Sequence, residues 1–308
     1  MRIAAVGRSE LLYATVERLV AAGHNIAVIV TAKEAPEYTR TAEDFQSLAM
    51  RLGCPFIRTA RIAERIPELV ALGPMDLAVS VNYSGIIPQA VLDVFAGGVL
   101  NAHGGDLPRY RGNACHAWAI LNGEARAGLC IHRMIGGELD SGDIICREYH
   151  RIAADTRVTE LWQWMCGRIP HLFEQAAETL AADPGFVLER QSRDPRDALR
   201  CYPRQPSDGR IDWQRSAVDI LRLINASAHP YAGAFFRSGN ETLTVWSAAV
   251  VEDGEQFLAV PGQVTAVTGE WLQVATGAGK IQLNEIRTIA GQHVVPNVLV
   301  ASLRTRLS

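Results

Sequence analysis

The chain has 308 residues, of which 48% are hydrophobic and 20% charged, and its formal net charge is −3. This length suits two domains, and the balanced charge disfavours nucleic acid or an anionic membrane as a partner. No apolar run reaches the roughly 18 residues that a membrane-spanning helix needs. The six cysteines form no CxxC pair and no signal peptide is recognisable, so we expect a cytoplasmic protein with reduced thiols.

Strand-like and helix-like segments alternate over the first two thirds of the chain. We expect strands at 2–6, 25–31, 75–81, 98–103, 128–134 and 144–152, and helices at 10–22, 43–52, 61–72, 88–95, 114–121 and 156–182, with a mobile loop at 32–42. This alternation predicts an α/β domain with a doubly wound, Rossmann-like, mostly parallel sheet, whose ligands bind beyond the carboxyl ends of the strands. The first turn, Gly7-Arg8-Ser9, lacks GxGxxG, which disfavours a nicotinamide dinucleotide.

A stretch rich in turn residues at 202–209 separates a second region. Beyond it we expect one helix at about 214–226 and β-like runs at 232–237, 241–250, 262–267, 271–275 and 279–287, a pattern that fits a small OB-like β-barrel. The predicted domains are therefore 1–202 and 203–308. Residues 205–308 hold eight Lys and Arg against nine Asp and Glu, which makes a poor phosphate-binding surface. The apolar run from Phe257 to Val260 could pair two copies into a homodimer.

Two polar clusters stand at the ends of predicted strands. Asn101 and His103 are two residues apart on a strand, so their side chains share a face, and Asp140 lies in a glycine-rich loop after the next strand. An amide, an imidazole and a carboxylate at such places form a plausible acid–base set, although each could instead be satisfied structurally. A Cys115–His116 nucleophile pair is disfavoured because neighbours on a helix do not face each other. The remaining histidines show no ligand spacing, so we expect no metal.

Several motifs together resemble those of the folate-dependent formyltransferases. They are Asn-x-His at 101–103, Leu-Pro-x-Tyr-Arg-Gly at 107–112 and Leu-Asp-x-Gly-Asp at 139–143, in the order found in methionyl-tRNA formyltransferase and the sugar-nucleotide N-formyltransferases. The segment 244–247 is most similar to the domain that formylates UDP-4-amino-4-deoxy-L-arabinose. The resemblance implies N10-formyltetrahydrofolate as the donor, a primary amine as the acceptor, and Asn101, His103 and Asp140 as the catalytic trio.

The trio suits direct attack of the amine on the formyl carbon through a tetrahedral intermediate, with no covalent enzyme species. Asn101 can donate an N–H to the forming oxyanion. His103 can also donate, and an imidazole can change its charge near neutral pH. Asp140 can orient the imidazole and help take the proton of the amine.

The resemblance also implies two sets of binding residues. The folate pocket would be lined by Asn82, Tyr83, Ile86, Ile87, Pro88, Gly136, Gly137, Glu138 and Leu139. Acceptor contacts would come from Gly105, Asp106, Tyr110 and Arg111, although Tyr110 and Arg111 could equally fix their own loop in place.

The acceptor is the least determined part of the prediction. Family members often carry Ser-Leu-Leu-Pro where this chain has Gly105-Asp106-Leu107-Pro108, and an acidic residue there favours an acceptor other than tRNA. The leading interpretation is the amine of a nucleotide-linked amino sugar. The alternatives are initiator methionyl-tRNA and a hydroxyornithine-type amine in siderophore assembly. A folate-binding protein that has lost catalysis is disfavoured by the intact trio.

Overall fold

A computed structural model describes residues 1–36, 38–300 and 302–308, so Glu37 in the predicted loop lies outside the described residues. The chain divides into two compact units. The first comprises Met1–Cys115, Arg126–His150 and Trp162–Tyr202, and the second comprises His116–Ala125, Arg151–Leu161 and Pro203–Ser308. The second unit thus includes two short segments that precede the predicted boundary at 202.

The first unit is built on a seven-stranded sheet. Its order is β3 (Phe56–Arg58), β2 (Asn25–Thr31), β1 (Arg2–Gly7), β4 (Leu77–Val81), β5 (Val99–His103), β7 (Arg126–Arg133) and β8 (Ile144–Arg151). The strands from β3 to β5 pair in parallel, and β7 pairs with β5 in the antiparallel sense. The prediction of an α/β fold with a mostly parallel sheet is confirmed.

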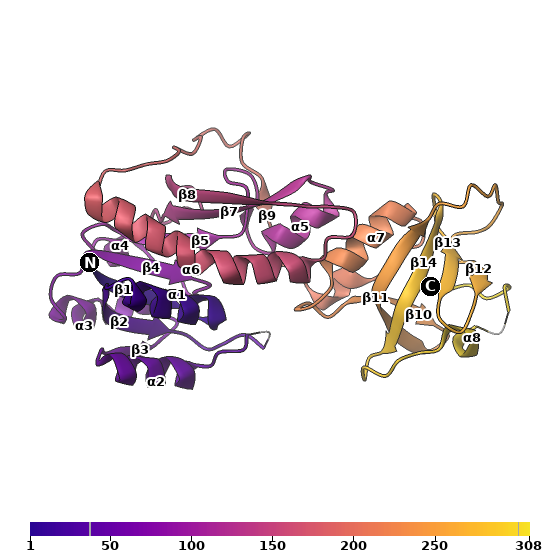
Figure 1. Cartoon of the computed structure of the whole chain (residues 1–308), viewed down its shortest axis with the longest axis horizontal. Helices are drawn as coiled ribbons and strands as arrows, with labels where there is room; N and C mark the ends of the chain where they lie inside the picture. The colour runs from indigo at the N-terminus through magenta and orange to yellow at the C-terminus, as the bar shows by residue number, and fades with distance from the viewer. Residues whose placement is uncertain (37, 301) are drawn as a thin grey trace. The chain divides into compact units, whose positions relative to one another are not determined.

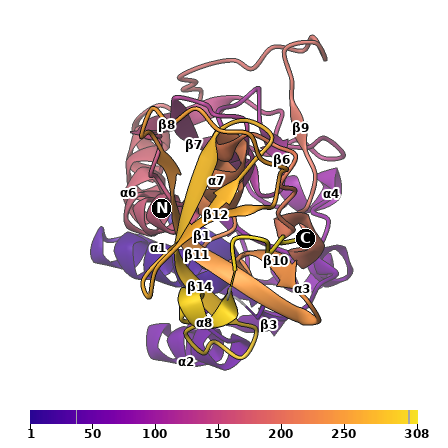
Figure 2. The same cartoon turned by 90° about the vertical axis from the view of Figure 1, so that its right-hand side faces the viewer.

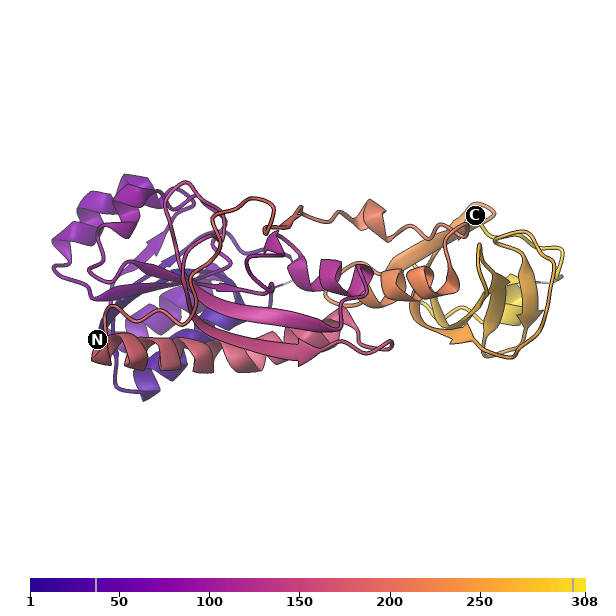
Figure 3. The same ribbon diagram turned by 90° about the horizontal axis from the view of Figure 1, so that it is seen from above.

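Helices cover both faces of this sheet (Figure 1 and Figure 3). One core joins the sheet to α1 (Ser9–Ala21), α2 (Ala42–Leu52) and α6 (Val158–Ala182), and a second joins it to η1 (Ile62–Arg65), α3 (Ile66–Ala71) and α4 (Gln89–Leu92). Strand β1 contributes to both cores, because alternate side chains of a strand point to opposite faces. Ile3 and Ala5 lie in the first core, and Ala4 and Val6 lie in the second. The sheet is therefore doubly wound.

Local sequence signals explain some of the helix ends. Helix α2 begins after a capping box of Thr41 and Asp44 and ends at Gly53, whose φ of 67° is easy for glycine. The predicted helix at 88–95 begins one residue later and ends sooner, since Pro88 is extended and α4 covers Gln89–Leu92. The predicted helix at 61–72 is a 3₁₀ turn followed by α3, with a proline at the junction.

The second unit contains a five-stranded antiparallel sheet (Figure 2). Its order is β10 (Ala234–Ser238), β11 (Glu241–Val251), β14 (Lys280–Thr288), β13 (Leu272–Ala275) and β12 (Val264–Val267). Helix α7 (Ala217–Ala226) packs on β11 and β14 and adds Ile220 and Ile224 to the core. All five predicted β-runs are strands, and the OB-like barrel stays a prediction.

Short elements complete the chain. Strands β6 (Arg111–Gly112) and β9 (Arg200–Cys201) form a two-stranded parallel ladder in the first unit. Helix α5 (Cys115–Leu121) follows β6, and η2 (Pro206–Gly209) and α8 (Pro296–Leu299) belong to the second unit. Within the described residues, no helix has the length and apolar character that crossing a membrane requires.

Candidate active site

Strand β5 and the loop after β7 bring the predicted catalytic trio together. Asp140 Oδ2 lies 3.4 Å from His103 Nδ1, and its other oxygen, Oδ1, lies 3.4 Å from His132 Nε2. His132 stands opposite Asn101 in the β5–β7 register, and Asn101 Nδ2 is 3.4 Å from His132 Nε2. A continuous polar chain therefore runs from Asn101 through His132 and Asp140 to His103.

His132 is the residue that sequence reasoning missed. It is almost fully buried in a strand that otherwise reads as an apolar run, and its Nδ1 lies 2.9 Å from the carbonyl oxygen of Arg133. The available signal was a single imidazole among apolar residues. Only the antiparallel register of β7 on β5 shows that this imidazole faces Asn101.

The Asp140 carboxylate is buried and strongly stabilised in its charged form. Its side chain is 11% exposed, and Gly112 N–H donates to Oδ2 at 2.9 Å. Burial by itself raises the pKa of this carboxyl, but the charge on His103, the hydrogen bond and charge of His132, and the Gly112 N–H together hold that pKa well below its usual range. Asp140 therefore acts as a permanent anion between two imidazoles.

Gln191 holds the backbone around Asp140. Asp140 has a φ of 48°, a left-handed conformation that costs energy for a residue with a side chain. Gln191 Nε2 donates to the carbonyl oxygens of Asp140 at 2.9 Å and Gly142 at 2.6 Å, and its Oε1 accepts from Arg111 at 2.9 Å. Gln191 lies in irregular structure before β9, and no motif in the sequence marks it.

The predicted acceptor residues make close contacts within the protein. The Tyr110 carbonyl oxygen lies 2.6 Å from His103 Nε2, and the Tyr110 side chain is buried. At Gly105 a Cβ would lie 2.6 Å from His103 Nε2 and 2.3 Å from the Tyr110 oxygen, so the loop requires glycine there. The Asp106 carboxylate pairs with Arg147 at 2.6 Å. Together with the Arg111–Gln191 hydrogen bond, these contacts favour the interpretation that Tyr110 and Arg111 fix their own loop.

The two predicted folate-binding segments are neighbours. Gly136 N–H donates to Gln89 Oε1 at 3.1 Å, and a Cβ at Gly136 would meet the Gln89 backbone, so the loop at 136–139 abuts the residue that follows Pro88. Ile86 is 84% exposed and Leu139 is 38% exposed, which is unusual for side chains of this size.

The other members of that set differ in their contacts within the protein. Asn82 has a φ of 53° and its carbonyl accepts from Arg8 at 2.8 Å, while the Tyr83 hydroxyl donates to the Thr59 carbonyl at 2.8 Å. Glu138 accepts from Ser141 and from Arg193. Ile87 is buried in the second core, and Gly137 has open space around it.

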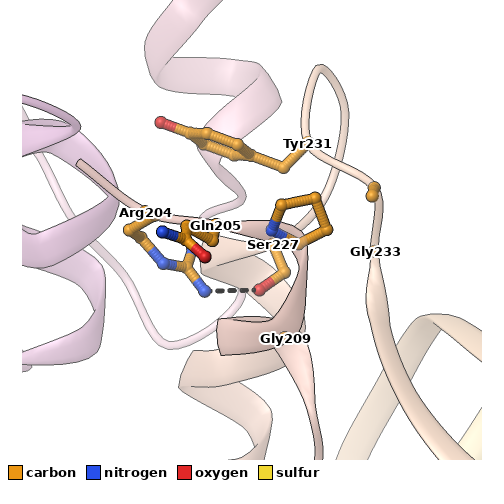
Figure 4. Close-up of a pocket in the computed structure, with 8 residues that line it drawn as sticks. Arg204, Gln205, Gly209, Ser227, Tyr231 and Gly233 are labelled. Atoms are coloured by element: carbon orange, nitrogen blue, oxygen red, sulfur yellow. Dashed lines mark hydrogen bonds between the residues drawn. The ribbon is translucent and has the colours of Figure 1, made fainter.

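Two further features of the described residues concern metal binding and a hollow in the second unit. In the described part of the chain, no group of three or more His, Cys, Asp and Glu side chains could hold a metal ion. A hollow of about 70 Å³ in the second unit is lined by Arg204, Ser227 and Tyr231 among others (Figure 4). Arg204 donates to Ser227 Oγ at 3.0 Å and to the Ala226 carbonyl at 2.8 Å, so this guanidinium secures the end of α7.

Several solved structures, among them two named as formyltransferases, share this fold. WlaRD, a sugar 3N-formyl transferase in the presence of dTDP and 5-N-formyl-THF, aligns with a TM-score of 0.70 and 14% identity over 92% of this chain and 97% of that one. The N-formyltransferase from Helicobacter canadensis, in complex with folinic acid and dTDP-3-aminofucose, aligns with a TM-score of 0.67 and 14% identity over 92% and 99%. HypX from Aquifex aeolicus aligns over 94% of this chain with a TM-score of 0.61 and 18% identity, and this chain spans 44% of HypX. These similarities define the fold class.

The sequence itself defines the family. The model described as "Formyl transferase" matches residues 1–166, and "Formyl transferase, C-terminal domain" matches residues 204–303. The chain belongs to the formyl transferase family. The predicted resemblance, and with it the prediction of a formyltransferase enzyme, is confirmed.

Proposed function

We propose that this enzyme moves a formyl group from N10-formyltetrahydrofolate to the primary amine of a nucleotide-linked amino sugar. The observation that carries the proposal is the polar chain of Asn101, His132, Asp140 and His103, with successive contacts of 3.4 Å. The sugar-nucleotide acceptor is supported by the two similar enzymes whose structures were solved with dTDP or dTDP-3-aminofucose. The near-neutral charge of residues 205–308 argues against tRNA.

The residues near the 136–139 loop fit a folate. Ile86 and Leu139 offer exposed apolar surface on the two adjoining segments, and Gly137 leaves open space beside them. An aromatic pteridine would cover such a surface, while backbone groups of 136–139 could bind its polar edge. When bound, the donor supplies an activated formyl carbon.

The chemistry assigned to the protein is electrostatic and acid–base. The Asn101 amide would stabilise negative charge on the formyl oxygen. His103 would take part in moving the proton of the amine, and Asp140 would stabilise the imidazole in its charged form. His132 would position Asp140 and Asn101 together. Because His103 Nε2 faces the Tyr110 carbonyl at 2.6 Å, we expect the 105–111 loop to shift when the acceptor binds.

The domain roles follow from the same proposal. Residues 1–202 would carry the donor and acceptor sites, and residues 203–308 would form the OB-like domain. We further propose a cytoplasmic location, where reduced folates and sugar nucleotides are present.

A panel of acceptors tests the proposal. The purified protein is incubated with N10-formyltetrahydrofolate and, separately, a 4-amino or 3-amino sugar linked to UDP or dTDP, methionyl-tRNA, and hydroxyornithine, and release of tetrahydrofolate is followed. We expect turnover with a sugar nucleotide and none with charged tRNA. Turnover with tRNA alone would replace the proposed acceptor, and near wild-type turnover by the Asn101→Ala, His103→Ala and Asp140→Ala variants would refute the proposed site.

A further inference from the structure

Two buried thiols lie beside the active site and have no part in the proposed chemistry. Cys115 is the first residue of α5 and Cys201 the last of β9, and they are 3% and 4% exposed. Their side chains are in hydrogen-bond contact with each other. The backbone keeps them together, because Gly112 pairs with Cys201 in the β6–β9 ladder and Asn113 N–H donates to the Cys201 carbonyl at 3.1 Å.

One of these thiols contacts His103, and the other lies on the strand that pairs with the residue donating to Asp140. Cys115 Sγ lies 3.7 Å from His103 Nε2, on the nitrogen that does not face Asp140. Gly112, the ladder partner of Cys201, donates its N–H to Asp140 Oδ2 at 2.9 Å. A change in the bonding of the two sulfurs therefore acts directly on the groups that hold the imidazole and the carboxylate.

The pKa values of the two thiols are shifted in opposite directions. The hydrogen bond with Cys201, burial and the charge of Asp140 all raise the pKa of the Cys115 thiol, whereas the same hydrogen bond lowers the pKa of the Cys201 thiol in spite of burial. Since the thiolate is the nucleophile, Cys201 is the sulfur that reacts first. Burial raises the pKa of Cys130 to about 12 and that of Cys146 to about 11, so these thiols stay protonated and inert.

We propose that Cys115 and Cys201 are an oxidation site, in which a reversible disulfide joins the two residues and lowers formyl transfer by disturbing His103. With a peroxide as the oxidant, the Cys201 thiolate attacks one peroxide oxygen, the O–O bond breaks, and the departing hydroxide takes a proton to become water. The resulting sulfenic acid is attacked by Cys115, which loses its proton as the S–O bond breaks and a second water leaves. Two electrons pass from the sulfurs to the peroxide, and a dithiol reductant returns them.

The expected effect follows from the lost contact. His103 Nε2 lies 2.6 Å from the Tyr110 carbonyl oxygen, so this nitrogen is a donor and Cys115 Sγ, at 3.7 Å, is a second and weaker acceptor beside it. A disulfide ties the start of α5 to β9 and draws Cys115 Sγ away from this contact. Disturbing one contact of the His103 imidazole by an amount comparable to one hydrogen bond corresponds to roughly a tenfold change in rate. We expect a decrease of about that size in turnover, restored by dithiothreitol.

The experiment uses the full-length reduced protein treated with increasing hydrogen peroxide. Peptide mass mapping identifies the disulfide, turnover with the accepted amine measures the effect, and NMR of ring-labelled histidine, assigned with His103→Gln, reports the His103 imidazole. We expect a 115–201 disulfide, a moved His103 signal, and reversal of both by dithiothreitol. The mass and NMR measurements need no acceptor, so they decide the inference even if the proposed sugar-nucleotide substrate is wrong.

Matched variants complete the test. Cys201→Ala, with Cys201→Ser as a second form in case the first fails to fold, should keep basal turnover but lose the disulfide and the inhibition. Cys146→Ala removes an equally buried thiol and should leave both in place. Oxidation that joins other cysteines, the absence of any 115–201 disulfide, or equal inhibition of the Cys201 variants would overturn the proposal.

Discussion

Replacing Gln191 by alanine should lower turnover although this side chain is placed outside the reacting groups. The substitution removes two N–H donors, to the carbonyls of Asp140 at 2.9 Å and Gly142 at 2.6 Å, in a buried environment. At about 1 kcal/mol for each hydrogen bond, the conformation that presents Asp140 loses about 2 kcal/mol. If that loss is transmitted in full to the active geometry, kcat falls by about 30-fold. The left-handed backbone of Asp140 makes relaxation favourable once the two bonds are gone.

The assay separates positioning from general damage. Steady-state kinetics give kcat and KM, and urea unfolding gives the free energy of unfolding of each variant. Gln191→Glu keeps the size of the side chain and an acceptor for Arg111 but turns the two donors into acceptors that face carbonyls, so its kcat should fall at least as far. Gln282→Ala, on β14 in the second unit, should leave kcat unchanged. Wild-type kcat in a folded Gln191→Ala enzyme would refute the positioning role.

Four further predictions concern the polar chain and its surroundings. Asn101→Ala removes an oxyanion donor, so it should reduce kcat by about 10²–10³-fold with a smaller change in KM. Both constants are measured by tetrahydrofolate release, and a change in KM alone would contradict that role. His132→Phe should reduce kcat by roughly 10–100-fold, because Asp140 loses a charge-assisted hydrogen-bond partner. His132→Gln can still donate to Asp140 and should recover part of the rate. Equal rates for the two variants would contradict the role of His132 in positioning Asp140. The lowered pKa of Asp140 implies that wild type is more stable than Asp140→Asn by about 2 kcal/mol above about pH 4. This advantage decreases below about pH 4, where the carboxyl is protonated in the unfolded chain first, so urea unfolding should show it in full at pH 7 and 5 and reduced at pH 3. Arg147→Met removes the 2.6 Å partner of the Asp106 carboxylate, which is 30% exposed and keeps Arg126 at 3.3 Å, so we expect a loss of about 2 kcal/mol in urea unfolding. An unchanged stability with a raised KM would instead favour Asp106 as an acceptor-binding residue.

The fold was predictable because its strands and helices carry strong local patterns. Strand β5 could be located from its apolar run and the glycine before it, and two-residue alternation placed Asn101 and His103 on one face. The short elements were missed for a physical reason: β6 and β9 have two residues each, too few for any periodicity. Their pairing depends on contacts such as the hydrogen bond from Arg111 N–H to the Leu199 carbonyl, between residues far apart in sequence.

The active site was predictable only in part. A motif indicated Asp140, but the role of His132 depends on the register of β7, and a shift of one residue would turn its side chain to the other face of the sheet. Gln191 belongs to a segment with no regular structure, so neither its burial nor its partners leave a pattern in the sequence. Residues that hold a site together are thus harder to find from sequence than those that perform its chemistry.

The crowding at Gly105 limits how this enzyme can diverge. Even a methyl group there would press on the imidazole nitrogen and the neighbouring carbonyl, so the position admits no new side chain during evolution. A descendant that changes its acceptor must therefore alter residues farther along the loop or on the surfaces around it, while position 105 remains glycine.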